Sequence, residues 1–232
     1  MAQLLYIHGS GCTEDSFRAQ ADAFLGSDAV TLPGHPGGEA FETVEEASAW
    51  FARYVEWRHA GRAVAAGNSL GGAIAIRWAL DYPEQVAGLI LIGTGARLRV
   101  SPAIFKMLDE DWPACVSALA KGELGPNASP ELRERVAGWH REVGREAMRR
   151  DYGACDRFDV MTELAELQIP TLVIVGSADQ LTPPKYAAYL HEHIAGSQLA
   201  VIEEAGHLAM TERPLEVNAA IAAFLATTRS EP

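Results

Sequence analysis

Cysteine is scarce in this chain. Only three cysteines occur among the 232 residues, and they are widely spaced: Cys12, Cys115 and Cys155. An odd, dispersed set excludes a disulfide framework and does not suggest a metal cluster. We do not expect Cys12 to be a nucleophile. A catalytic thiol needs a paired histidine, and a serine elsewhere in the chain is the better partner for the candidate histidine. We therefore expect free thiols and no metal or organic cofactor.

The chain also has few basic residues and no long hydrophobic run. It carries 19 lysines and arginines against 31 aspartates and glutamates, which gives a formal net charge of −12. This balance disfavours nucleic acid and anionic membrane surfaces as partners. No apolar stretch approaches the roughly 20 residues that cross a bilayer, and the first residues lack the basic region and apolar core of a signal peptide. The sequence predicts a cytoplasmic protein without nucleic-acid or membrane partners.

What the chain does contain is a hydrophobic share of 48%, sufficient for one buried core. Apolar runs alternate with helix-like segments, which is typical of an α/β fold with a doubly wound, mostly parallel sheet. The stretch from 101 to 167 breaks this alternation with helix-like runs and is too long for a connecting loop. The expected strands are six, near residues 4–7, 28–32, 63–67, 87–93, 171–176 and 198–203.

The most informative motif is a serine between two glycines. The sequence G-N-S-L-G at 67–71 follows the apolar run 63–66 and precedes a helix-like segment, so its context is strand, sharp turn and helix. A serine that attacks a carbonyl projects from a strained turn of this kind, and small neighbours are needed where strand and helix nearly collide. The flanking pattern favours a nucleophilic Ser69 over an ordinary glycine-rich turn.

A serine nucleophile needs a histidine base and a carboxylate that orients the base. Asp179 stands in a loop just beyond the apolar run 171–175, and His207 follows a second apolar run, 198–202. Both residues therefore fall near the carboxyl ends of predicted strands, where an α/β sheet binds its ligands. The sequence predicts a triad of Ser69, Asp179 and His207.

These motifs together resemble the α/β-hydrolase family, in particular its compact serine esterases, enol-lactonases and carbon–carbon-bond hydrolases. The resemblance covers nearly the whole length and implies a core of residues 1–100 and 168–232 with a helical cap, 101–167, inserted into it. The strand that precedes His8 and Gly9 is expected near residues 4–7, so we expect a sheet trimmed to about six strands. Five pieces carry the resemblance: Leu4 to Gly11, Leu32 to His35, Gly67 to Gly72, Gly176 to Pro183, and Ala205 to His207.

The resemblance also implies further site residues. In this family two backbone N–H groups form the oxyanion hole, and the matching positions here are Ser10 and Leu70. Such donors stabilise the negative oxygen of a tetrahedral intermediate. Because the cap covers the catalytic serine in this family, a minority of its apolar side chains are expected to line the acyl pocket. The residues proposed for this pocket are Phe105, Trp112, Trp139 and Phe158.

Other polar residues receive lesser roles. We interpret His8 as structural and His35, in a Pro-Gly loop, as a contact at the rim of the site. Three acids of the cap could in principle replace Asp179 as the group that orients the histidine. Their position away from the strand-end loop disfavours them: Asp151, Asp156 and Asp159.

The sequence thus predicts a carboxylesterase that cleaves short-to-medium-chain esters through an acyl-enzyme intermediate, with a small-molecule ester as its partner. Two alternatives stay open. A carbon–carbon-bond hydrolase or enol-lactonase would need a group that recognises a substrate carboxylate, for which Arg97, Arg99 or an arginine of the cap is available. A receptor of the same fold would bind a small molecule without turning it over.

Overall fold

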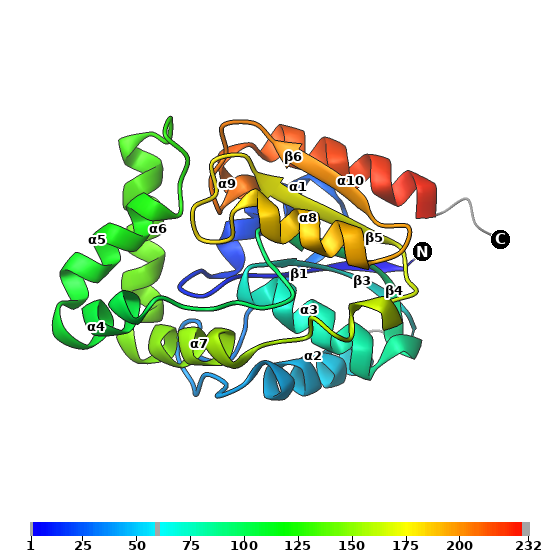
Figure 1. Ribbon diagram of the computed structural model, residues 1–232, viewed down its shortest axis with the longest axis horizontal. Coiled ribbons are helices and arrows are strands. Elements are labelled where there is room, and N and C mark those ends of the chain that lie inside the picture. Colours follow the sequence, from blue (N-terminus) through cyan, green and yellow to red (C-terminus); the bar gives the residue numbers. More distant parts are fainter. Residues whose placement is uncertain (1, 59–60, 229–232) are drawn as a thin grey trace.

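The fold is a six-stranded, all-parallel sheet with helices on both faces (Figure 1). The computed structural model describes residues 2–58 and 61–228. The strand order in the sheet is β2-β1-β3-β4-β5-β6, which confirms the predicted α/β class and the trimmed sheet. The strands are β1 (Gln3–Ile7), β2 (Asp28–Val30), β3 (Ala63–Asn68), β4 (Val86–Ile92), β5 (Thr171–Gly176) and β6 (Gln198–Ile202).

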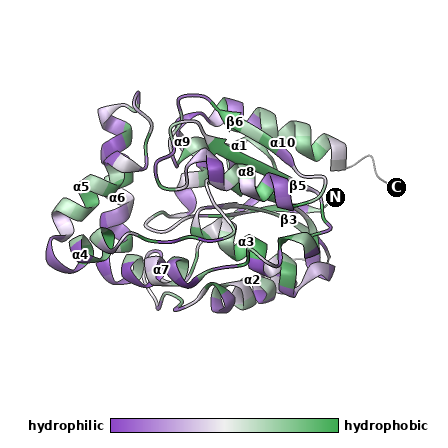
Figure 2. Ribbon diagram, in the orientation of Figure 1, coloured by the Kyte–Doolittle hydropathy of each residue, from purple (hydrophilic) through white to green (hydrophobic). Residues whose placement is uncertain are grey.

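The central strands are apolar on both faces because helices cover both sides of the sheet. In β1, Leu5 and Ile7 join one large hydrophobic cluster, whereas Leu4 and Tyr6 join the other. This division follows from the alternation of side chains along a strand. Figure 2 shows hydrophobic residues along the strands and a mixture of hydrophobic and hydrophilic residues on the surrounding helices.

Two groups of helices bury these faces. The cluster that contains Leu5 and Ile7 is completed by apolar residues of α2 (Val44–Arg58), α3 (Leu70–Asp81) and α8 (Pro184–His193). The opposite cluster is completed by residues of α10 (Pro214–Thr228) and by residues next to α1 (Arg18–Ala23) and in α9 (Ala209–Glu212). Short 3-10 helices lie at Glu14–Phe17, Pro83–Gln85 and Leu164–Glu166.

Four helices interrupt the alternation between β4 and β5, and we call residues 102–157 the α4–α7 segment. In Figure 1 helices α4, α5 and α6 gather at the end of the molecule opposite the chain termini, which is the end toward which the parallel strands run. The segment therefore stands where ligands bind in open α/β sheets. The division into 1–100, 101–167 and 168–232 stays a prediction. The helices are α4 (Pro102–Glu110), α5 (Trp112–Gly122), α6 (Pro130–Val143) and α7 (Arg145–Arg157).

Candidate active site

Ser69 occupies the turn between β3 and α3 in a strained backbone conformation, with φ of 53° and ψ of −116°. A positive φ is uncommon for a residue with a side chain and marks a position that its surroundings hold in place. The surroundings here are two glycines. A Cβ on Gly67 would come within 2.1 Å of the Gly71 carbonyl oxygen, and one on Gly71 would come within 2.1 Å of the Ile7 carbonyl oxygen. Only glycine fits at either position.

His207 and Asp179 form a buried hydrogen-bonded pair at the neighbouring strand ends. The Nδ1–H of His207 donates to Oδ2 of Asp179 at 2.9 Å, and both residues are 4% exposed. Burial lowers the pKa of His207, but the charge and hydrogen bond of Asp179, together with the charges of Glu123 and Glu212, raise that pKa by more, so it lies above its ordinary value of 6.5. Burial likewise raises the pKa of Asp179, but His207 and local hydrogen bonds bring it below the ordinary value.

Thr182 completes the support of Asp179, and the sequence did not predict this role. The backbone N–H groups of Leu181 and Thr182 each donate to Oδ1 of Asp179 at 2.9 Å. The Thr182 hydroxyl donates to Oδ2 at 2.8 Å and lies 3.1 Å from Nδ1 of His207. Aspartate commonly bonds the backbone two or three residues ahead, so the spacing D-x-x-T was the available signal.

The backbone of the His207 loop is held from two directions. The N–H of His207 donates to the carbonyl oxygen of Glu123, at the end of α5, at 2.7 Å. The Asn68 side chain donates to the carbonyl oxygen of His207 at 3.1 Å. Glu212 joins the same two regions, because its carboxylate accepts the N–H groups of Gly125 and Gly206, both at 2.7 Å. The histidine loop is therefore fixed before any ligand binds.

A cavity of about 330 Å³ opens beside Ser69 and His207, which both line it. Arg99 and Gln180 contribute polar groups to its wall. Its other walls are largely apolar, as is usual for small-molecule sites. They include Leu98, Val100, Ile104, Tyr152 and Leu181.

The four aromatic residues proposed as pocket walls are not among the residues that line this cavity. Phe158 and Trp139 are 2% and 6% exposed and belong to the two large clusters on opposite faces of the sheet. Phe105 and Trp112 are partly buried and pack against the small cluster formed by helices α4 to α7. Their size makes these side chains the best fillers of helix interfaces, so burial between elements overrides the predicted role.

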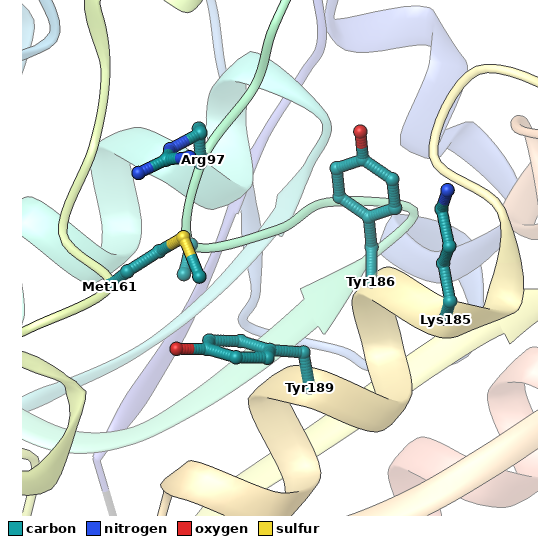
Figure 3. A pocket seen from close by; sticks show the side chains of 6 residues that line it. Arg97, Met161, Lys185, Tyr186 and Tyr189 are labelled. Carbon is teal, nitrogen blue, oxygen red and sulfur yellow. The ribbon is translucent and has the colours of Figure 1, made fainter.

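Arg97 and Arg99 lie at different places despite their proximity in sequence. Arg97 lines a neighbouring cavity, shown in Figure 3, and forms an ion pair with Asp159 in which Nε lies 2.7 Å from Oδ2. Arg99 lines the cavity of Ser69, and its guanidinium donates to the backbone carbonyl oxygen of Asp156 at 2.6 Å. Tyr186 lines both cavities.

Ser10 and Leu70 follow two adjacent strands, β1 and β3, and Leu70 comes directly after Ser69. β1 and β3 are parallel neighbours, with Ile7 opposite Gly67, so the loops that follow them meet. A Cβ placed on Gly9 would be 3.2 Å from the Cβ of Ser69. Leu70 is the first residue of α3, a position whose N–H has no partner within the helix and is available to an anion.

The structure gives the remaining polar residues other functions. His8 is buried and structural as predicted: its Nδ1–H donates to the Gly9 carbonyl oxygen, its Nε2 accepts from Leu32, and burial lowers its pKa to about 3. The prediction of His35 as a rim contact is wrong, because His35 is 2% exposed. Burial, together with nearby carboxylates, raises the pKa of the Cys12 thiol, which disfavours the thiolate that a nucleophile requires.

The rival acids are engaged elsewhere. Asp151 contacts Ser10 and His35, Asp156 accepts the N–H of Val100, and Asp159 pairs with Arg97. Within residues 2–58 and 61–228, no group of three or more histidine, cysteine, aspartate and glutamate side chains could hold a metal ion. In the same part of the chain, no helix combines the length and apolar character needed to span a membrane.

The chain belongs to the alpha/beta hydrolase family, whose model matches residues 4–220. A pimeloyl-[acyl-carrier protein] methyl ester esterase of Neisseria meningitidis is 29% identical over 221 residues, which cover 87% of this chain and 84% of that protein. A 3-oxoadipate enol-lactonase of Acinetobacter baylyi is 28% identical over 174 residues, 68% of this chain and 62% of the relative.

Solved structures agree with this assignment. The structure of a thermophilic esterase is 34% identical, superposes with a TM-score of 0.89, and covers 97% of this chain and 90% of its own. These three similar proteins are two esterases and an enol-lactonase, which supports the predicted ester hydrolase.

Proposed function

We propose that this protein is a carboxylesterase in which Ser69, His207 and Asp179 form the catalytic triad. The observation that carries the proposal is the buried pair of His207 and Asp179, 2.9 Å apart, beside a strained serine that lines the same cavity. Fold similarity alone would not justify a function, because one fold serves many chemistries. Here Ser69, Asp179 and His207 each follow a strand, and their order along the chain matches the family's order of nucleophile, acid and base.

The reaction would proceed through an acyl-enzyme. His207 takes the proton of Ser69 as the serine oxygen attacks the ester carbon, and the carbonyl oxygen becomes an oxyanion bound by the N–H groups of Ser10 and Leu70. The tetrahedral intermediate collapses, the alkoxide leaves with the proton from His207, and the acyl group stays on Ser69. Water repeats the sequence and releases the acid. Asp179 holds the imidazole in the tautomer with the proton on Nδ1.

The cavity favours esters with short-to-medium, uncharged acyl chains. Its volume of about 330 Å³ is at the small end of ligand pockets, and several of its walls are aliphatic. Each buried methylene contributes about 0.8 kcal/mol, so the rate should rise with acyl length until the cavity is full. We propose that the α4–α7 segment is the cap over this cavity and that the enzyme acts on small-molecule esters in the cytoplasm.

The test is a hydrolysis panel of p-nitrophenyl esters of increasing acyl length, with Ser69→Ala as the negative control. We expect kcat/KM to pass through a maximum at short-to-medium length and Ser69→Ala to be inactive. Monotonic improvement into long chains would contradict the proposed substrate class. Undiminished hydrolysis by Ser69→Ala would contradict the triad.

A second candidate function is cleavage of a substrate that carries a carboxylate, as enol-lactones do. Arg99 favours it, because this cation lines the cavity of Ser69 and its guanidinium bonds a backbone carbonyl oxygen. Adding an enol-lactone and a vinylogous diketone to the same panel separates this function from simple ester hydrolysis. Tight binding without turnover of any of them would instead support a receptor.

A further inference from the structure

The α4–α7 segment reaches the oxyanion side of the site through a buried carboxylate. Asp151, in α7, is 3% exposed. Its Oδ2 accepts the Ser10 hydroxyl at 3.0 Å and Nε2–H of His35 at 2.7 Å. Ser10 and Asp151 are 141 positions apart in the sequence, so this bond joins the loop after β1 to an inserted helix.

The charge of Asp151 is balanced inside the protein. Both ring nitrogens of His35 face oxygen acceptors, Asp151 on one side and the Pro33 carbonyl on the other, so only the protonated ring can donate to both. Burial lowers the pKa of His35, but Asp151 and hydrogen bonds to the backbone of Pro33 and Leu32 together raise it by more, so the pKa lies above its ordinary value. A neutralised pair can sit beside a developing oxyanion without opposing its charge.

A second helix of the same segment holds the next residue of the loop. Nδ1–H of His140, in α6, donates to the carbonyl oxygen of Gly11 at 2.9 Å. His140 is fully buried, and its Nε2 lies 3.2 Å from Oε2 of Glu123. Two successive residues of the loop, Ser10 and Gly11, are thus each bound by a side chain of the α4–α7 segment.

We propose that Asp151 is a positioning residue that sets the oxyanion hole by holding Ser10 through its hydroxyl. This inference rests on the proposed function, because it assumes that the N–H of Ser10 binds the oxyanion. The hydroxyl and the N–H belong to one residue, so anchoring the first restricts rotation of the second. A hydrogen bond to a charged acceptor is stronger than a neutral one, and a buried one is not exchanged with water.

The experiment compares Ser10→Ala, Asp151→Ala and the double variant. Ser10→Ala removes the anchor but keeps the backbone donor. We measure kcat and KM for a short p-nitrophenyl ester, and Ki for an alkyl trifluoromethyl ketone. The ketone carbon bonds to the Ser69 oxygen, the serine proton passes to His207, and the former carbonyl oxygen becomes an oxyanion in the hole.

We expect each single variant to lose roughly 10- to 100-fold in kcat, the range for a displaced transition-state donor, while KM stays within about threefold. Ki for the ketone should rise by a similar factor. The double variant should be no worse than Asp151→Ala, because both substitutions cut the same bond. A merely structural role would lower the melting temperature but would leave the ratio of Ki to KM unchanged.

The matched control is Asp159→Ala, which breaks another contact between the predicted cap, 101–167, and the predicted core, the ion pair with Arg97, away from Ser10. It should retain wild-type Ki for the ketone. If Asp151→Ala does not fold, Ser10→Ala decides alone. Wild-type kcat and Ki in Ser10→Ala would overturn the inference, as would a loss of kcat without weaker ketone binding. Activity that survives Ser69→Ala would instead overturn the proposed function.

Discussion

The backbone N–H of His207 donates to the backbone carbonyl oxygen of Glu123 at 2.7 Å. Glu123 caps the end of α5, so the loop that carries the proposed base is bonded to the α4–α7 segment. On the other side of the site, Asp151 of α7 bonds Ser10. The α4–α7 segment therefore contacts both the loop of the proposed base and the proposed oxyanion side, and a change in its packing should alter catalysis as well as access.

We predict that Ser69→Ala lowers kcat by about a million-fold, because the proposed mechanism requires the serine oxygen as the atom that becomes acylated. The fold should survive, since alanine keeps the small side chain in the turn. Steady-state kinetics on a short activated ester give the rate, and circular dichroism with thermal melting gives the fold. A folded variant that keeps most of the activity would move the nucleophile elsewhere.

We predict that activity falls at acidic pH through a single ionisation of His207 above the ordinary value of about 6.5. Only the neutral imidazole can accept the serine proton. Because the folded pKa is raised, the pair with Asp179 stabilises the fold most fully below the unfolded pKa, and this contribution is lost as pH rises through the folded pKa. Around the folded pKa of His207, stability from this pair and activity thus change in opposite directions with pH.

The check is a pH profile of kcat/KM recorded beside melting temperatures. Asp179→Asn should shift the acidic limb toward lower pH, because the charge that raises the histidine pKa is gone, and should reduce turnover. An unchanged limb in a folded Asp179→Asn variant would show that His207 is not the titrating group or that another acid orients it.

We predict that Thr182→Val lowers kcat by about tenfold. The hydroxyl donates to the Asp179 oxygen that also accepts from His207. A hydrogen bond to a charged group contributes about 1.5–3 kcal/mol, and about 1.4 kcal/mol in the barrier corresponds to tenfold in rate. Thr182→Ser keeps the hydroxyl and should retain most of the turnover. Equal losses in the two variants would assign the effect to packing.

We predict that Gly71→Ala destabilises the fold by about 3 kcal/mol or more, because its Cβ would overlap the Ile7 carbonyl oxygen at 2.1 Å. The matched control is Gly138→Ala in α6, where an added Cβ meets nothing within 4 Å and the gain in helix propensity is about 0.5–1 kcal/mol. Urea unfolding of both variants measures the difference. Equal stability of Gly71→Ala and wild type would contradict the close approach of strand and helix.

We predict that Arg99→Ala selectively weakens hydrolysis of esters whose acyl chain ends in a carboxylate. Arg99 lines the cavity of Ser69, whereas Arg97 faces the neighbouring cavity and is paired with Asp159 (Figure 3). Arg97→Ala is therefore the control. The measurement is kcat/KM for a neutral ester and a carboxylate-bearing ester of equal length. A loss in Arg97→Ala but not Arg99→Ala would reverse the assignment.

The sequence by itself determined the elements and their order. Apolar runs and helix-like segments reflect burial, which is a local property of each segment, and all six strands were predicted from them. The serine turn was predicted from the glycines on either side of Ser69 and from the strand and helix that flank them. The pairing of Asp179 with His207 could also be anticipated, because both residues follow parallel strands whose carboxyl ends share one edge.

Only the tertiary structure decided what the α4–α7 segment touches. The pattern of a helix says that an apolar face is buried but not against which neighbour, so Trp139 and Phe158 were predicted in the pocket and lie in the two large clusters. The same limit applies to His35 and Asp151, which are 116 positions apart and meet in the interior. Contacts between distant segments depend on how whole elements pack, and no local periodicity encodes that packing.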